Sequence, residues 1–311
     1  MMRKMSIFAI RDVELAVSDI SRTSTFYADT WGLQKLEPDG DSDVFRATGV
    51  EHHVLVLRPR AQPGLLSIGL AASTAEEVDA IYQSLLTQRQ TVLTAPHELP
   101  TSLGGGYGLE IATPLGIRVR VSANVSKHSN LIEDSSRPKK LSHVVINIPD
   151  RATHTRWFIE QLGFKLSDTT RTQTFLRCGT DHHSLAFGDS KTPSINHIAY
   201  EMEDIDGVMF GAGRMMDYGY ESEWGLGRHG PGSNVFNYFI DPEGVAIEYT
   251  AELDQITDQA TEPGEPEYWS GFPRRPCRWG VARQPSERLR SAFSGEGSSV
   301  ILATSRSTDG V

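Results

Sequence analysis

Cysteine is scarce in this sequence, and long apolar runs are missing. Of the 311 residues only two are cysteines, Cys178 and Cys277, which are far apart and in no paired spacing. We therefore expect no disulfide framework and a reducing compartment, the cytoplasm. No run of about 18 apolar residues is present, so no membrane-spanning helix is expected. Arg11 and Asp12 interrupt the apolar part of the N-terminus before the core of a signal peptide could form.

Positive charge is also in deficit. The 30 Lys and Arg residues are outnumbered by 40 Asp and Glu residues, which gives a formal net charge of −10. This charge argues against nucleic acid or an anionic membrane as a general partner. The hydrophobic content of 38% and the charged content of 23% are those of an ordinary globular protein, and the length allows two domains.

An internal repeat organises the chain. Residues 10–33 resemble residues 141–164, since each stretch has a short alternating strand, a polar helix start, an amphipathic helix with aromatic side chains and a closing glycine. The similarity continues at an offset near 130 residues, and each copy ends in a turn-bounded hairpin, TPLG in the first and DPEG in the second. These patterns predict an α+β protein of two tandem domains built from paired βαβββ modules.

The repeat sets the expected domain boundaries. We predict an N-terminal domain at residues 1–125, a polar linker at 126–138 and a C-terminal domain at 139–254. Residues 255–311 are rich in Pro, Gly, Ser and Arg. We expect them to form an irregular tail that packs in part and frays at its end.

The hairpin of the second copy carries an acid where a core side chain is expected. In the stretch FNYFIDPEGVAIEY, Pro242 suits the first central position of a type I turn and Gly244 the left-handed position after it. This register places Tyr238 across from Glu248 on the inward face. A buried carboxylate needs a partner, and no cation is nearby in sequence. Histidines are the next candidates, because imidazole and carboxylate together hold divalent metals.

Two strand histidines complete a candidate metal site. His143 and His197 each occupy a predicted strand position that faces the same concave side as Glu248. Two imidazoles and one carboxylate leave open positions on an octahedral ion, as in non-haem Fe(II) oxygenases, whereas a structural zinc site takes four protein ligands. The first copy has other residue types at the three equivalent positions: Asp12, Ser67 and Arg120.

Further polar groups are expected around these ligands. The loop GRHGPG presents His229 among glycines, and Tyr238 lies beside Glu248. In DHHSLAF, strand alternation lets only one of His182 and His183 face the site. Any one of these residues, taken alone, is more often structural than functional. A histidine in a strand, for example, usually only makes hydrogen bonds within the fold or at its surface. Their concentration in one copy, at positions where the other copy has nothing equivalent, favours a function.

The sequence resembles the type I extradiol ring-cleavage dioxygenases of the vicinal oxygen chelate superfamily. The C-terminal signature of that family is matched by Gly227, His229, Tyr238, Asp241, Pro242, Gly244 and Glu248. Asn237 stands where the signature has an apolar residue. The resemblance covers about residues 1–250. It implies two tandem vicinal-oxygen-chelate domains with open barrel-like sheets, of which only the C-terminal one holds a metal.

The resemblance also implies the roles of the candidate residues. His143, His197 and Glu248 would bind Fe(II), and Mn(II) is compatible with the same ligands. His182, favoured over His183, would be the acid-base group, while His229 and Tyr238 would hydrogen-bond the substrate oxygens.

The implied reaction is the cleavage of a catechol or a substituted or bicyclic aromatic diol by O2, beside its two hydroxyls. The product is of the muconic semialdehyde type, and the reaction belongs to aromatic catabolism. The resemblance also implies that the protein is a homo-oligomer. Two other hypotheses are a glyoxalase-like isomerase and a non-enzymatic small-molecule-binding protein of the same fold. Glyoxalase-like sites usually draw ligands from both repeats, and the first copy does not offer a good second half.

Overall fold

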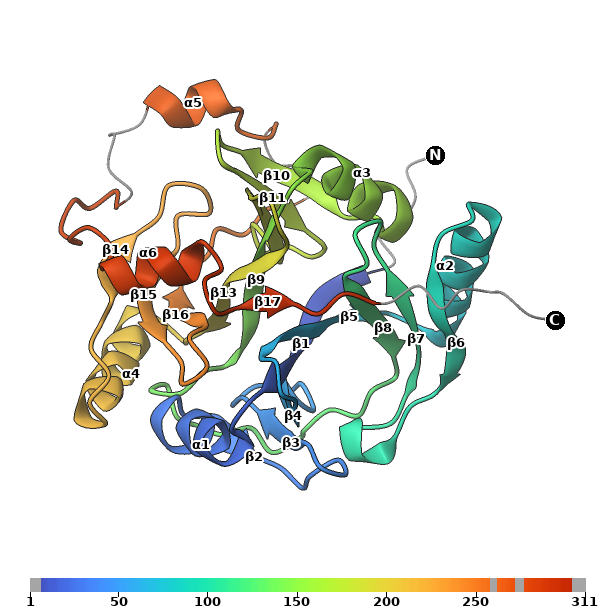
Figure 1. Ribbon diagram of the computed structural model, residues 1–311, viewed down its shortest axis with the longest axis horizontal. Helices are drawn as coiled ribbons and strands as arrows, with labels where there is room; N and C mark the ends of the chain where they lie inside the picture. Colours follow the sequence, from blue (N-terminus) through green and yellow to red (C-terminus); the bar gives the residue numbers. More distant parts are fainter. Residues whose placement is uncertain (1–6, 258–261, 272–276, 304–311) are drawn as a thin grey trace.

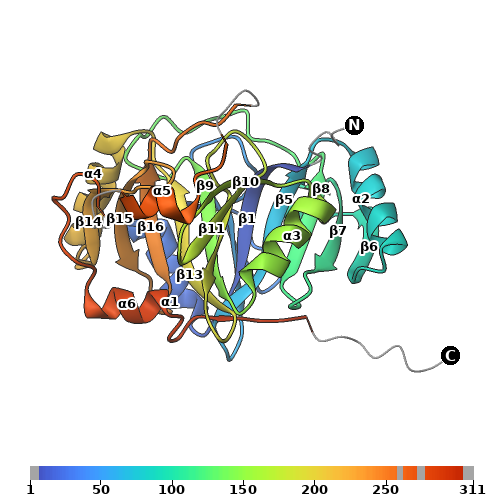
Figure 2. The same cartoon turned by 90° about the horizontal axis from the view of Figure 1, so that it is seen from above.

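The computed structural model describes residues 7–257, 262–271 and 277–303, and its strands form two similar curved sets that lie side by side (Figures 1 and 2). The prediction of two tandem, open barrel-like units built from βαβββ modules is confirmed. The described residues contain no helix long and apolar enough to cross a membrane. Both cysteines are free, as expected.

The first unit contains two modules. The first module has β1 (Ile7–Val17), α1 (Ile20–Thr25), a π-helical turn (Phe26–Thr30), β2 (Gln34–Lys35), β3 (Asp43–Arg46) and β4 (Leu55–Pro59). The second has β5 (Gly64–Ala72), α2 (Ala75–Thr87), β6 (Val92–Glu98), a 3-10 turn (Thr101–Leu103), β7 (Tyr107–Ala112) and β8 (Arg118–Ala123). The strand order is β2-β3-β4-β1-β5-β8-β7-β6, with the first strands of the two modules antiparallel in the middle.

The second unit repeats this topology. Its first module has β9 (Lys140–Ile148), α3 (Arg151–Leu162), β10 (Lys165–Thr169), β11 (Gln173–Arg177) and β12 (Leu185–Asp189). Its second has β13 (Ser194–Glu201), α4 (Ile205–Asp217), β14 (Trp224–Arg228), β15 (Val235–Ile240) and β16 (Ala246–Ala251). The order is β10-β11-β12-β9-β13-β16-β15-β14, the counterpart of the first unit strand by strand.

Local sequence explains where the helices begin. The side chains of Asp19, Thr74, Asp150 and Asp204 each accept a hydrogen bond from the backbone N–H three residues further on. Such a cap satisfies a helix donor that has no partner in the helix, and it stabilises by about 1 kcal/mol. All four helices therefore begin directly after the first strand of their module.

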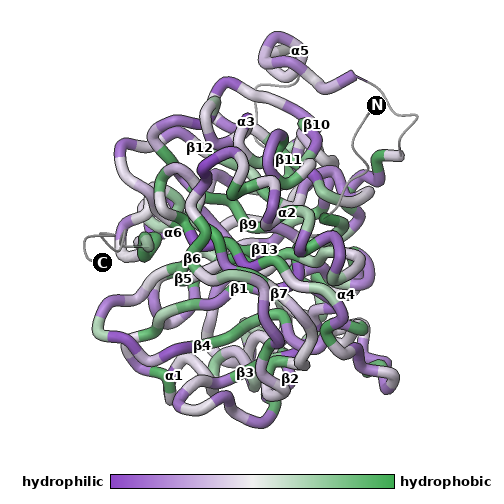
Figure 3. The backbone as a smooth tube through the Cα atoms, turned by 90° about the vertical axis from the view of Figure 1, so that its right-hand side faces the viewer, coloured by the Kyte–Doolittle hydropathy of each residue, from purple (hydrophilic) through white to green (hydrophobic). Residues whose placement is uncertain are grey.

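The two units are packed against each other through one hydrophobic core. Trp31, which follows α1, stacks on Tyr249 of β16 with 3.7 Å between ring centroids. In the reciprocal contact, Trp157 of α3 donates a hydrogen bond to Gln90 after α2. The first helix of each unit thus packs against the other unit, and Figure 3 shows apolar segments running through the centre of the molecule.

The predicted hairpin of β15 and β16 is confirmed. Tyr238 lies opposite Glu248, and Asp241 and Val245 close the turn with a backbone hydrogen bond of 2.9 Å. Gly244 has a φ of +88°, a conformation that costs a side-chain-bearing residue energy.

The prediction of an irregular tail is wrong in part. The tail contains α5 (Pro266–Gly271), α6 (Glu287–Phe293) and the short strand β17 (Ser299–Val300). Ser299 pairs with both Ser194 of β13 and Gly64 of β5, so the tail crosses from one unit to the other. The expected fraying falls on residues 304–311, which lie outside the described residues. The predicted domain boundaries stay predictions.

Candidate metal centre

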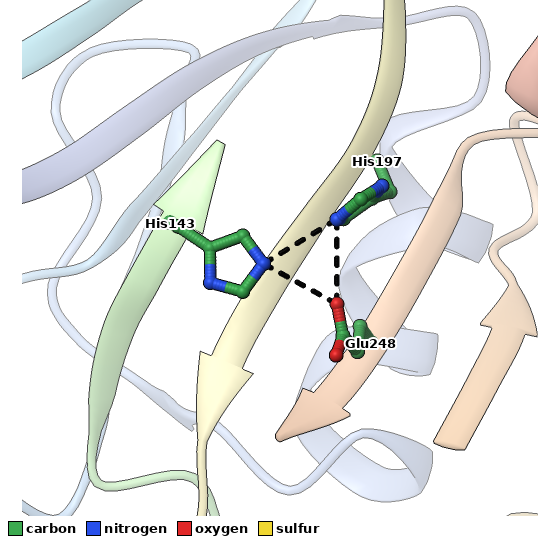
Figure 4. A group of neighbouring side chains, drawn as sticks. All are labelled: His143, His197 and Glu248. Atoms are coloured by element: carbon green, nitrogen blue, oxygen red, sulfur yellow. Dashed lines mark hydrogen bonds and ion pairs between the residues drawn. The ribbon is translucent and has the colours of Figure 1, made fainter. Parts of the chain in front are cut away.

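Three side chains on neighbouring central strands meet at one point inside the second unit (Figure 4). His143 Nε2 lies 3.3 Å from His197 Nε2, and both nitrogens lie close to Glu248 Oε2, at 3.4 and 3.3 Å. All three residues are buried, and Glu248 is completely inaccessible to solvent. They form the one such group of potential metal ligands within the described parts of the chain.

The strand register brings the three ligands together. Ala199 on β13 lies directly opposite His143 on β9 and directly opposite Glu248 on β16. His197 precedes Ala199 by two residues and therefore points to the same face of the sheet. The three expected ligands are thus neighbours because their strands are adjacent in the middle of the unit.

The chemistry of this donor set fits a divalent metal ion. Metal binding needs neutral imidazoles and an ionised carboxylate. Burial lowers the pKa of His197 to about 3, which keeps its imidazole neutral. Burial acts to raise the pKa of Glu248, but the hydrogen bond and charge interaction with His143, together with the interactions with His197 and His229, outweigh it and leave the pKa below its ordinary value. Oε2 of Glu248 is buried and accepts no hydrogen bond from the described residues, so it is available to an ion.

Each ligand is held by a polar neighbour on its far side. His197 Nδ1 is 2.8 Å from Asn196 Oδ1, and His143 Nδ1 is 3.0 Å from Ser142 Oγ. If the Nδ1 atoms carry the protons and donate to these oxygens, both Nε2 lone pairs face the shared point. Asn234 Nδ2 donates to Glu248 Oε1 at 3.1 Å, which leaves Oε2 turned toward the histidines.

His229 and Tyr238 lie beside the ligands, as the sequence predicted. His229 Nε2 is 2.9 Å from the Tyr238 hydroxyl and 3.9 Å from Glu248 Oε1. Burial lowers the pKa of His229 to about 4. Burial and the Glu248 carboxylate raise the pKa of Tyr238 far above its usual range, so its phenol stays protonated. Trp224 stacks on Tyr238 at 5.3 Å and fixes the ring.

The preference for His182 over His183 is wrong with respect to which ring faces the site. His183 lines the cavity next to the ligands and its ring centroid is 4.2 Å from that of His143, whereas His182 points away to Asp168. The physical reason is that β12 begins only at Leu185. Both histidines lie in a bend before the strand, where side chains do not alternate as they do in a strand.

The expectation that the first unit has no equivalent histidines also needs correction. His52 and His53 correspond to His182 and His183, and their Nδ1 atoms are 3.2 Å apart. The other positions differ as expected. Arg120 forms an ion pair with Asp12 where the second unit has Glu248 and His143.

Ser67, the counterpart of His197, donates a hydrogen bond to Glu14. The place of the ligand set in the first unit is therefore filled by a salt bridge and a hydrogen bond.

A cavity of about 780 Å³ opens beside the ligands. His143, His183, His197, His229 and Tyr238 form its inner wall. The outer wall includes Arg171 between β10 and β11 and, from the tail, Trp269, Arg278 and Phe293.

Sequence reasoning missed this contribution of the tail, although the adjacent aromatic residues Tyr268 and Trp269 were a signal. It also missed the polar residues that hold the ligands, which carry no local pattern.

Comparison with known proteins places these features in context. Residues 140–249 match the family model described as "Glyoxalase/Bleomycin resistance protein/Dioxygenase superfamily". Metapyrocatechase 2 of Cupriavidus necator is 38% identical over 122 residues, which is 38% of each chain. Biphenyl-2,3-diol 1,2-dioxygenase of Paraburkholderia xenovorans (strain LB400) is 25% identical over 269 residues, covering 79% of this chain and 88% of the relative.

Among solved structures, the Mn(II)-bound glyoxalase from Novosphingobium aromaticivorans superposes with a TM-score of 0.84 at 34% identity. The match covers 92% of this chain and 95% of that one.

Proposed function

Because this chain belongs to the glyoxalase/bleomycin resistance protein/dioxygenase superfamily, we propose that it is a metal-dependent extradiol dioxygenase of aromatic catabolism. The substrate is a catechol or a substituted or bicyclic aromatic diol, and both atoms of O2 enter the product. The observation that carries the proposal is the three-residue ligand set with a cavity on its open side, into which His183, His229 and Tyr238 project. The resemblance inferred from the sequence is confirmed at the level of the family.

His143, His197 and Glu248 would hold the metal, Fe(II) or Mn(II). The metal would supply a centre at which the diol and O2 are brought together and exchange electrons. Two imidazoles and one carboxylate suit this role, because they leave several coordination positions for substrates.

The other cavity residues transfer protons to and from the substrate and orient it. His183 takes a proton from a diol hydroxyl and returns one as the ring opens. His229 and Tyr238 hydrogen-bond the diol oxygens, since both side chains stay uncharged and point at the ligand set. The aromatic rings of Trp224, Trp269 and Phe293 exclude water and hold the substrate ring.

The direct test is O2 consumption by purified protein loaded anaerobically with Fe(II) or, separately, Mn(II). Catechol, 4-methylcatechol and 2,3-dihydroxybiphenyl form a suitable panel of diols. We expect one O2 per diol and a ring-opened product whose mass is that of the diol plus two oxygen atoms. Absence of O2 uptake with every diol and with both metals would contradict the proposal.

A second candidate is a glyoxalase-like isomerase, which the 34% identity to a Mn(II)-bound glyoxalase favours. Against it, the equivalent positions of the first unit are occupied by the Asp12–Arg120 ion pair and contribute no ligand. Isomerisation of the adduct of methylglyoxal and glutathione without O2 uptake would identify this activity.

We also propose a cytoplasmic homo-oligomer. Two free cysteines are consistent with a reducing compartment. Light scattering during size-exclusion chromatography would give the mass, and a mass of about 34.3 kDa, that of one chain, would contradict an oligomer.

A further inference from the structure

A hydrogen-bonded chain of three buried side chains runs from the cavity wall into the second unit. His183 Nδ1 lies 3.0 Å from His182 Nδ1, and His182 Nε2 lies 2.8 Å from Asp168 Oδ2. The three residues are 3%, 4% and 7% exposed, so water does not compete for these contacts. Nδ1 of His183 is engaged by His182, which leaves Nε2 as the nitrogen for the cavity.

The positions of the protons in this chain are constrained. An ionised carboxylate only accepts, so Nε2 of His182 carries a proton directed at Asp168. The contact between the two Nδ1 atoms holds one proton, because a hydrogen bond needs one donor and one acceptor. If that proton is on His183, its Nε2 presents a lone pair to the cavity and both rings are neutral. If it is on His182, that ring is a cation beside Asp168, and His183 presents an N–H.

We propose that Asp168, His182 and His183 form a proton relay for the dioxygenase reaction, an inference that rests on the proposed function. When His183 Nε2 accepts a proton from a diol hydroxyl, its Nδ1 proton passes to His182 Nδ1. The O–H bond of the diol and the Nδ1–H bond of His183 break, and an N–H bond forms on each ring. The net proton then rests on His182 beside Asp168, and the reverse transfer returns it as the ring opens.

The relay keeps positive charge away from the metal ligands. A cation on His183 would lie beside His143, whose ring centroid is 4.2 Å away, and therefore close to the positive metal ion that His143 would hold, and like charges repel. On His182 the charge instead meets a carboxylate, which is the favourable arrangement. Asp168 is itself fixed, because its Oδ1 accepts a hydrogen bond of 2.6 Å from the backbone N–H of Gly264.

The remaining surroundings of His182 carry no other charge among the described contacts. Its backbone N–H donates to the carbonyl of Asp254, its ring faces Phe175 of β11, and Gly232 lies against its edge. Asp168 is therefore the acid that a cationic His182 would pair with in the described structure.

The first unit provides an internal contrast. His52 and His53 make the same Nδ1 contact, at 3.2 Å, but among the described residues no carboxylate pairs with His52. The ring of His52 stacks on His128 instead, 5.4 Å away. The first unit does place a carboxylate near its pair, but on the other histidine: Asp12 Oδ2 lies 3.8 Å from His53 Nε2. Among the described residues, a carboxylate on the histidine that points away from the site occurs in the unit that has the ligand set.

The test variant is Asp168→Asn. The Gly264 N–H needs an acceptor, so the asparagine oxygen stays on that side and its NH2 group faces His182 Nε2. Nε2 of His182 must then accept a hydrogen bond from the asparagine, and Nδ1 of His182 must donate one to Nδ1 of His183. The proton of His183 is therefore on Nε2, which faces the cavity, so His183 has no free lone pair there to accept a proton from the diol. We expect kcat to fall about 100-fold, within the usual contribution of a general base, with metal content unchanged and KM changed less than about threefold.

A second readout does not depend on turnover. Binding of 4-nitrocatechol to the Fe(II) protein under nitrogen is followed by visible absorbance, which reports how many hydroxyl protons the probe has lost. We expect the probe to bind to Asp168→Asn with one proton more than to the wild type. The variant His182→Gln should behave in the same way if Asp168→Asn does not fold, and His52→Gln is the matched control that changes nothing.

The outcomes separate the two proposals. Wild-type protein that consumes no O2 contradicts the proposed dioxygenase, while the nitrocatechol spectra still test the relay. A variant at Asp168 or His182 with wild-type kcat and a wild-type nitrocatechol spectrum would overturn the relay.

Discussion

At the scale of single residues, the candidate site depends on side chains that are not themselves potential metal ligands. Asn196 is the clearest example, since its Oδ1 faces His197 Nδ1 at 2.8 Å. Its Nδ2 donates to Asn147 Oδ1 and to the carbonyl of Phe293, both at 3.1 Å. Asn196 therefore connects the orientation of a metal ligand to β9 and to helix α6.

We predict that Asn196→Ala weakens metal binding by about 10- to 100-fold, because the imidazole of His197 loses the acceptor that orients it. Competition between the protein and a chromogenic chelator for Mn(II) measures this affinity. Asn130→Ala, an exposed asparagine whose side chain has no role in the site, is the control. Equal affinities of Asn196→Ala and wild type would show that Asn196 does not position His197.

Asp241 gives a prediction about pH. It is buried in the hairpin turn, its Oδ2 accepts a hydrogen bond of 2.9 Å from Tyr27, and burial raises its pKa to about 6. The folded chain therefore holds the proton more tightly than the unfolded chain. The resulting stabilisation is fully present below about pH 4 and is lost as the pH rises through about 6. It amounts to at most about 3 kcal/mol.

Asp241→Asn should remove this dependence, because the amide does not titrate. Denaturant titrations between pH 4 and 7 give the free energy of unfolding of both proteins. The free energy of unfolding of the wild type minus that of Asp241→Asn should fall as the pH rises across this range. A difference that is constant or that rises with pH would contradict the raised pKa of Asp241.

At the scale of elements, the tail forms part of the cavity. Gly264 pairs with Asp168 of β10 and so fixes the start of the segment that carries α5, and Trp269 of α5 lines the cavity. Phe293 at the end of α6 packs against Tyr238 with 5.2 Å between ring centroids. Residues of both the second unit and the C-terminal tail therefore line the cavity.

We predict that Trp269→Ala raises KM about tenfold while kcat falls much less. Loss of one aromatic contact costs about 0.5 to 1.5 kcal/mol, and about 1.4 kcal/mol corresponds to a factor of ten. Steady-state O2 uptake with a diol found active measures both constants. Glu267→Ala changes an exposed side chain of the same helix that does not line the cavity, and it should leave KM near the wild-type value. A large fall in kcat with unchanged KM would contradict a binding role.

The elements differ in how far the sequence predicts them. The hairpin of β15 and β16 is predictable, because Pro242 and Gly244 specify the turn and the turn specifies the register. The candidate ligands can be predicted because side chains alternate between the two faces of each of the three strands. They also stand out because the first copy has Asp12, Ser67 and Arg120 at the equivalent positions. The prediction that His182 faces the site was wrong, because the side chains in the bend before β12 do not alternate between two faces as they do in a strand. The helices and strand of the tail were missed because segments of two to seven residues give no periodic signal.

At the scale of the whole molecule, one topology is used twice with different chemistry. The strand order of the first unit is repeated in the second, and both keep a histidine pair in the bend before the fourth strand. The first unit fills the equivalent of the metal site with the ion pair of Asp12 and Arg120. Its contribution is to packing, through contacts such as Trp31 on Tyr249 and the pairing of β5 with β17.

We propose that each chain holds one metal ion, in the second unit. The most direct test is elemental analysis of the protein after loading with Fe(II) under nitrogen and removal of free metal. We expect one ion per wild-type chain, almost none for His143→Gln, His197→Gln or Glu248→Gln, and one for Ser67→Ala, the matched change in the first unit. Retention of the metal by the three ligand variants, or two ions in the wild type, would contradict the account.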